Sequence, residues 1–75
     1  MNYDNLELTI KFQSDTMHIM SNGLEEKFTK QQSLGLLKQD RVILGDDHNL
    51  ISIGGYNMEK LQKEIKMYYL YGRRN

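Results

Sequence analysis

Residues 6–28, LELTIKFQSDTMHIMSNGLEEKF, decide the fold of this 75-residue chain. From Leu6 to Phe12, apolar residues alternate strictly with polar ones, which is the period of two expected of a β-strand with one buried face. A second alternating run, Thr16 to Ser21, follows the turn-forming residues Gln13 to Asp15. The two runs predict neighbouring strands.

Asn22-Gly23 is the residue pair that best tolerates the positive φ angles of a two-residue hairpin turn, so Leu24 to Phe28 is expected to return as a third strand. The alternation of this strand places Glu26 on the same face as two apolar residues, which is an imperfect pattern. A single helix from Leu24 through Leu37 is therefore an open alternative to a strand followed by a helix.

Thr29 is suited to cap the N-terminus of a short helix that reaches Lys38. In this helix Leu34 and Leu37 would face inward, and Gly35 would weaken the helix. Two further strands are expected at Arg41 to Leu44 and at Leu50 to Ile53. Both are rich in β-branched residues, and the turn-forming run GDDHN, residues 45–49, separates them.

The last segment predicts a long helix that Asn57 caps and Gly72 ends. At 100° per residue, one face is expected to join the core. It carries Met58, Leu61, Ile65, Tyr68 and Tyr69. The opposite face mixes lysines with large apolar side chains, an arrangement typical of a surface that another molecule covers. It carries Lys60, Lys63, Met67, Leu70 and Tyr71.

Together these elements predict an α+β fold in a single domain, residues 1–75. We expect one small antiparallel sheet of four to five strands, packed on one face by the C-terminal helix and by the short second helix. Whether residues 24–38 form a strand and a helix or one helix stays open.

Composition narrows the classes of function. The chain contains no cysteine and only two histidines, which argues against a disulfide framework and a structural zinc site. It has neither a membrane-length apolar run nor a basic, apolar leader at its start, so a soluble, untargeted, cytoplasmic protein is expected. Ten basic and ten acidic residues cancel, which disfavours a general polyanion binder.

Few residues suggest chemistry. Asp46, Asp47 and His48, with His18 as a remote fourth member, could hold a divalent metal or act as acid and base, but a solvated hairpin turn has the same composition. No serine lies in a Gly-x-Ser-x-Gly motif, and Gly54-Gly55 lacks the other residues of a phosphate-binding loop. We expect no enzyme activity, no cofactor, no metal and no small-molecule substrate.

The candidate site is therefore a surface for a macromolecular partner, most simply another protein. Tyr, Met and Arg are the residue types enriched at protein interfaces. The residues expected to bind the partner are Lys63, Met67, Leu70, Tyr71, Arg73 and Arg74. A nucleic acid held by the same basic, Tyr-rich end is one alternative, and an obligate homodimer that buries this face is another. Tyr3 could also pack against it.

The general style of the chain, short, rich in Lys and Asn, and without proline or tryptophan, resembles orphan reading frames of bacterial phages and mobile elements. This resemblance is one of composition and covers no particular residues. Small proteins of that kind commonly occupy a surface on a host protein, which implies an inhibitor or modulator.

Overall fold

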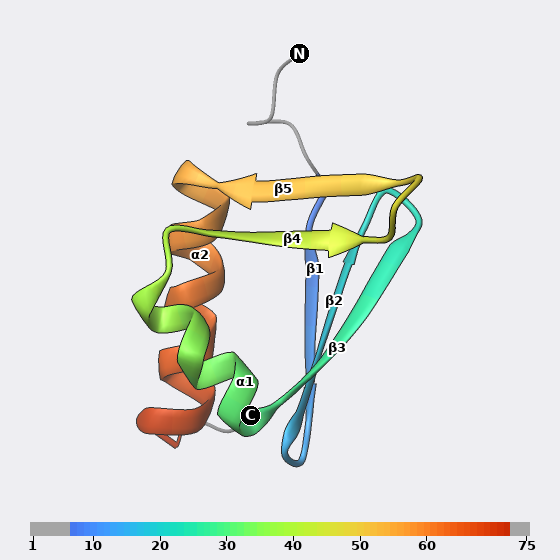
Figure 1. Cartoon of the computed structure of the whole chain (residues 1–75). Helices are drawn as coiled ribbons and strands as arrows, with labels where there is room; N and C mark the ends of the chain where they lie inside the picture. Colours follow the sequence, from blue (N-terminus) through green and yellow to red (C-terminus); the bar gives the residue numbers. More distant parts are fainter. Residues whose placement is uncertain (1–6, 73–75) are drawn as a thin grey trace.

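The computed structural model describes residues 7–72, which form an α+β domain (Figure 1). The strands are β1 (Thr9–Gln13), β2 (Thr16–Ser21), β3 (Leu24–Thr29), β4 (Arg41–Gly45) and β5 (Leu50–Gly54). The helices are α1 (Lys30–Gly35), which continues as the 3₁₀ turn η2 (Leu36–Lys38), and α2 (Gly55–Ile65), which continues as the π-helical turn η3 (Lys66–Leu70). The predicted fold class is confirmed.

The first three strands form an antiparallel meander in the order β1-β2-β3. Asn22 and Gly23 have φ angles of 51° and 82°, as the predicted hairpin turn requires. Residues 24–29 form a strand, so the alternative of one helix from Leu24 to Leu37 is wrong. The first strand begins at Thr9, while Leu6 lies outside the described residues.

Thr29 caps α1 as predicted. Its hydroxyl accepts a hydrogen bond from the Gln32 backbone N–H at 3.1 Å, and the Gln32 side chain accepts one from the Thr29 N–H at 2.9 Å. Leu34 and Leu37 are partly buried, as expected. The leucine that joins the core is Leu36, because winding changes from α to 3₁₀ after Gly35 and alters which side chains face inward.

The strands β4 and β5 form the predicted antiparallel hairpin, in which Val42 pairs with Ile53 and Leu44 with Ile51. They form a sheet of their own, however, so the expectation of one sheet needs correction: the five strands divide into a three-stranded and a two-stranded sheet. The hairpin crosses one end of the three-stranded sheet (Figure 1) because α1 and η2 carry the chain away from the edge of β3.

Glu26 joins the two sheets. Its carboxylate oxygen Oε2 accepts a hydrogen bond at 3.2 Å from the backbone N–H of Gly45, the last residue of β4. A side chain thus satisfies a donor at the end of β4 that a neighbouring strand would otherwise satisfy. This contact explains why an acidic residue stands between the apolar side chains of Leu24 and Phe28.

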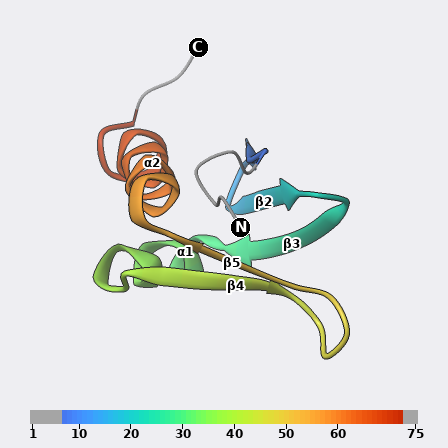
Figure 2. The ribbon, with the colours of Figure 1, turned by 90° about the horizontal axis from the view of Figure 1, so that it is seen from above.

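Figure 2 shows from above how α2, the three-stranded sheet and the hairpin are arranged, and the core is built from side chains of these elements and of η2. Its buried apolar residues come from β2, η2, both strands of the hairpin and α2. They are Met17, Ile19, Leu36, Val42, Leu44, Ile53, Met58, Leu61 and Ile65.

The start of α2 differs from the prediction. The helix begins at Gly55, Gly54 is its N-cap residue, and Asn57 lies buried in the first turn, so the expected Asn57 cap is wrong. Gly55 has a φ of 53°, which lets the chain turn from β5 directly into the helix without an intervening loop. At the other end Gly72, with a φ of 64°, follows the last turn as predicted.

Candidate partner-binding site

An aromatic cluster fixes the end of the last helix to β1. The rings of Phe12 and Tyr68 stack with centroids 4.3 Å apart, and Tyr69 meets both rings edge-on at 5.6 and 4.9 Å. The Tyr68 hydroxyl donates to the carbonyl oxygen of Ser14 at 3.2 Å. These contacts hold the inner side of η3 in one orientation.

Tyr69 is partly buried and packs against the core. Burial raises the pKa of its phenol above the ordinary value of 10.0, and the nearby Ser33 hydroxyl offsets this only in part. The ammonium group of Lys30 lies 5.9 Å from the centre of the ring. Tyr68 and Tyr69 therefore belong to the inner face, as the sequence indicates.

The π-helical turn η3 changes the outer face. The backbone N–H of Tyr71 donates to the carbonyl oxygen of Lys66 at 2.9 Å, five residues earlier rather than four. The extra residue in this turn sets the following side chain back around the helix by about 100° relative to an α-helix. Tyr71 consequently lies near the position that residue 70 would occupy in an unbroken α-helix.

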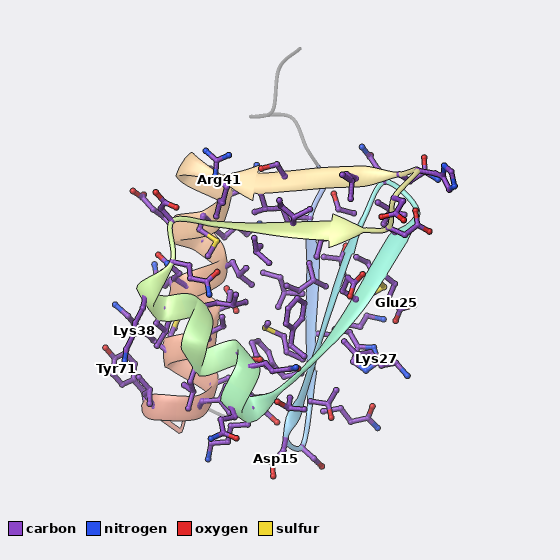
Figure 3. The ribbon with its side chains drawn as sticks, viewed as in Figure 1. Asp15, Glu25, Lys27, Lys38, Arg41 and Tyr71 are labelled. Atoms are coloured by element: carbon purple, nitrogen blue, oxygen red, sulfur yellow. The ribbon has the colours of Figure 1, made fainter. Side chains whose placement is uncertain are left out.

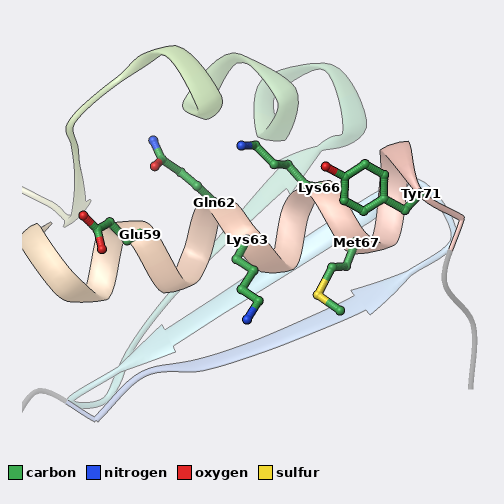
Figure 4. A pocket seen from close by; sticks show the side chains of 6 residues that line it. All are labelled: Glu59, Gln62, Lys63, Lys66, Met67 and Tyr71. Atoms are coloured by element: carbon green, nitrogen blue, oxygen red, sulfur yellow. The ribbon is translucent and has the colours of Figure 1, made fainter.

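A hollow of about 540 Å³ opens on the solvent side of the helix (Figure 4), and its lining consists of Glu59, Gln62, Lys63, Lys66, Met67 and Tyr71. Tyr71 is 71% exposed. Leu70 is also 55% exposed but does not line the hollow, so the structure separates it from the residues with which 100° periodicity groups it.

A second hollow, of about 420 Å³, continues the first toward the start of α2. It shares Glu59, Lys63 and Met67 with the first and ends at Tyr56, which is 70% exposed. We call this continuous surface the outer helix face. It comprises Tyr56, Glu59, Lys60, Gln62, Lys63, Glu64, Lys66, Met67 and Tyr71.

The sequence did not predict Tyr56 as a member of this face, because Asn57 was expected to cap the helix. The spacing contains the signal, since Tyr56 precedes Met67 by about three helical turns and so shares its side of the helix. The unbroken entry from β5 into α2 is what adds Tyr56 to the surface.

Gln62 supports the edge of this face. Its Nε2 donates to the carbonyl oxygens of Leu36 at 3.0 Å and Gln39 at 2.6 Å, and so ties η2 to α2. These two carbonyls lie at the end of η2, where that of Leu36 also accepts a hydrogen bond from the backbone N–H of Gln39 at 3.1 Å. The contact fixes one side of the hollow to the rest of the domain.

The outer helix face has unpaired cations. Within residues 7–72 neither Lys63 nor Lys66 forms an ion pair, and both are exposed. Figure 4 shows Lys63 and Met67 extending from one side of the helix and Lys66 from the other. Of the predicted site residues, Lys63, Met67 and Tyr71 thus come together, Leu70 does not, and Arg73 and Arg74 lie outside the described residues, as does Tyr3.

Hydrogen bonds to its own backbone order the acidic loop that contains Asp46, Asp47 and His48. The Asp46 carboxylate accepts hydrogen bonds from the backbone N–H groups of His48 and Asn49 at 2.9 and 3.1 Å, which lowers the pKa of Asp46. His18 lies on the outer face of the three-stranded sheet, with Nδ1 3.0 Å from Glu25 Oε2. Over residues 7–72, no three His, Asp or Glu side chains are arranged to hold a metal ion.

Comparison of the chain with protein-family models, with curated proteins and with solved structures found no match. In the part of the chain that the structure describes, no helix is both long and apolar enough to cross a membrane.

Proposed function

We propose that this chain is a non-catalytic protein-binding protein that engages its partner through the outer helix face. The observation that carries the proposal is the placement of Tyr71, an exposed ring that lines one hollow together with Met67 and Lys63.

The chemistry of the hollow supports a protein partner. Tyrosine buries a large ring and keeps a hydroxyl for hydrogen bonding, and methionine adapts its flexible side chain to the surface that it meets. Interfaces depend on a few such residues near their centre, surrounded by contacts of smaller energy. Tyr71 and Met67 would form this centre, with Lys63 and Lys66 at its rim.

We further propose that binding serves to inhibit or modulate the partner. The domain is small, and most of its large apolar side chains pack in the core, which leaves little room for a deep active site. A protein of this size can act by covering a surface that its partner needs for another contact. The compositional resemblance to phage and mobile-element reading frames supports a host protein as that partner.

Two neighbouring residues provide a matched test. We would replace Tyr71 with alanine in one variant and Leu70 with alanine in another, since both side chains are exposed but only Tyr71 lines the hollow. Tagged wild type and both variants would be used for affinity capture from a bacterial lysate, with and without nuclease, and the Kd of a captured protein would then be measured.

The proposal expects a stoichiometric protein that survives nuclease, is retained by Leu70→Ala and is lost or bound at least about tenfold more weakly by Tyr71→Ala. Equal affinity of wild type and Tyr71→Ala would contradict it. Recovery that disappears with nuclease would instead favour the alternative, a nucleic-acid-binding protein that uses the unpaired Lys63 and Lys66.

A further inference from the structure

We infer that the segment seated on the outer helix face is an acidic stretch of protein that carries one large apolar side chain. This inference rests on the proposed function and adds the chemistry of the partner. In this arrangement Tyr71 and Met67 receive the apolar side chain, and Lys63 and Lys66 receive the carboxylates on either side of it.

The positive charge of the lysines on the outer helix face supports an acidic partner. Lys60, Lys63 and Lys66 stand within two turns of α2 and η3, and none of them forms an ion pair within residues 7–72. The last part of the sequence, residues 58–75, has five basic and two acidic residues, a net charge of +3, so the remainder of the neutral chain has −3. An acidic segment is attracted to this end of the molecule and repelled by the rest.

The apolar side chains beside these lysines support a large apolar side chain in the partner. Met67 and Tyr71 line the same hollow as Lys63 and Lys66. One large side chain entering there would contact the thioether and the ring while its neighbours in sequence remain near the ammonium groups. A purely electrostatic surface would not need Met67 and Tyr71 in its lining.

The positions of the acidic residues favour a protein over a nucleic acid. Glu59 lines the hollow itself, and Glu64 lines its continuation. The evenly spaced phosphates of a nucleic acid strand would pass these carboxylates, which is unfavourable. A peptide can instead place its carboxylates opposite the lysines and neutral residues opposite the two glutamates.

The test uses random peptides displayed on phage, selected against the immobilised full-length protein. Enriched peptides are synthesised, and their Kd is measured by fluorescence anisotropy at low and high salt for wild type and two charge-reversal variants. Lys63→Glu with Lys66→Glu changes the hollow. Lys11→Glu with Lys27→Glu is the matched control, since it changes the net charge equally on the outer face of the three-stranded sheet.

Lys27 and Tyr71 lie on opposite sides of the molecule in Figure 3. We expect enriched peptides with Asp or Glu around one aromatic or aliphatic residue, a Kd that rises with salt, and binding at least about tenfold weaker in the Lys63/Lys66 variant. The Lys11/Lys27 variant should stay within about twofold of wild type.

The inference would be overturned by neutral or basic enriched peptides, by a failure to enrich any peptide, by equal losses in both variants, or by tighter binding of an oligothymidylate. A lysate protein whose capture depends on Tyr71 but not on the charges at Lys63 and Lys66 would also overturn it. In that last case the proposed function would still hold, so the two failures are distinguishable.

Discussion

The backbone N–H of Tyr71 donates to the carbonyl oxygen of Lys66 at 2.9 Å, one residue further back than in an α-helix. On the inner side of the same turn, Tyr68 stacks on Phe12 and Tyr69 is partly buried. Packing on the inner side therefore accompanies the wide turn that orients Tyr71 on the outer side. Core and candidate site meet in these few residues.

Phe12 should accordingly matter for both stability and binding. Phe12→Ala removes a partly buried ring that contacts Tyr68 and Tyr69, and we expect the free energy of unfolding to fall by about 2 kcal/mol. Urea unfolding monitored by circular dichroism measures this change. Lys11→Ala, at the neighbouring exposed position, is the control and should stay within about 0.5 kcal/mol of wild type. A loss of under about 0.5 kcal/mol for Phe12→Ala would contradict the role of the cluster.

Two glycines should respond to alanine in opposite directions. At Gly45, with a φ of 107°, an added Cβ would clash with the carbonyl oxygen of Asn49, so Gly45→Ala must distort the turn and is expected to cost more than about 2 kcal/mol. At Gly35 the backbone is helical and the space is open, so Gly35→Ala should stabilise the fold by about 0.5 to 1 kcal/mol. Urea midpoints that move in the same direction would contradict the assigned conformations.

Glu26 should connect the two sheets. Glu26→Ala leaves the N–H of Gly45 without its acceptor, and we expect a loss of about 1 kcal/mol in the free energy of unfolding. Glu26→Gln keeps an acceptor oxygen and should lose less. Glu25→Ala is the comparison, since the Glu25 carboxylate meets only His18 on the solvent side. Equal effects at positions 25 and 26 would argue against the bridge.

Tyr69 should limit stability in alkali. Because burial raises the pKa of Tyr69 above 10.0, the fold favours the neutral phenol. This contribution is complete below the unfolded pKa and is lost as the pH rises through the folded pKa. Wild type should therefore lose more stability than Tyr69→Phe as the pH rises above 10.0. Parallel curves for the two proteins in urea titrations would disprove this assignment.

Local sequence patterns were sufficient to predict most of the individual strands and helices. Strand alternation, Asn22-Gly23 and Thr29 each predict a feature that the structure confirms, because each depends on neighbours in sequence. The division into two sheets was not predictable in the same way. It depends on how α1 and η2 redirect β4 and on the bond between Glu26 and Gly45, residues that lie far apart in the chain.

The candidate site could likewise be predicted from the sequence only in part. Fixed helical periodicity places Lys63, Met67 and Tyr71 together, but it also includes Leu70 and leaves out Tyr56. Both differences arise where the helix departs from regular geometry, at the π-helical turn and at the direct entry through Gly55. A period of 3.6 residues contains no information on either departure.

The most direct test of the central claim is the scalar coupling transmitted across the hydrogen bond of Tyr71, measured by nuclear magnetic resonance on isotope-labelled protein. The coupling joins the amide nitrogen of the donor to the carbonyl carbon of its acceptor, so it identifies the acceptor residue. We expect Tyr71 to couple to Lys66. A coupling to Met67 instead would mean a regular α-helix, in which Tyr71 would stand about 100° further around the helix and would no longer have the orientation described above.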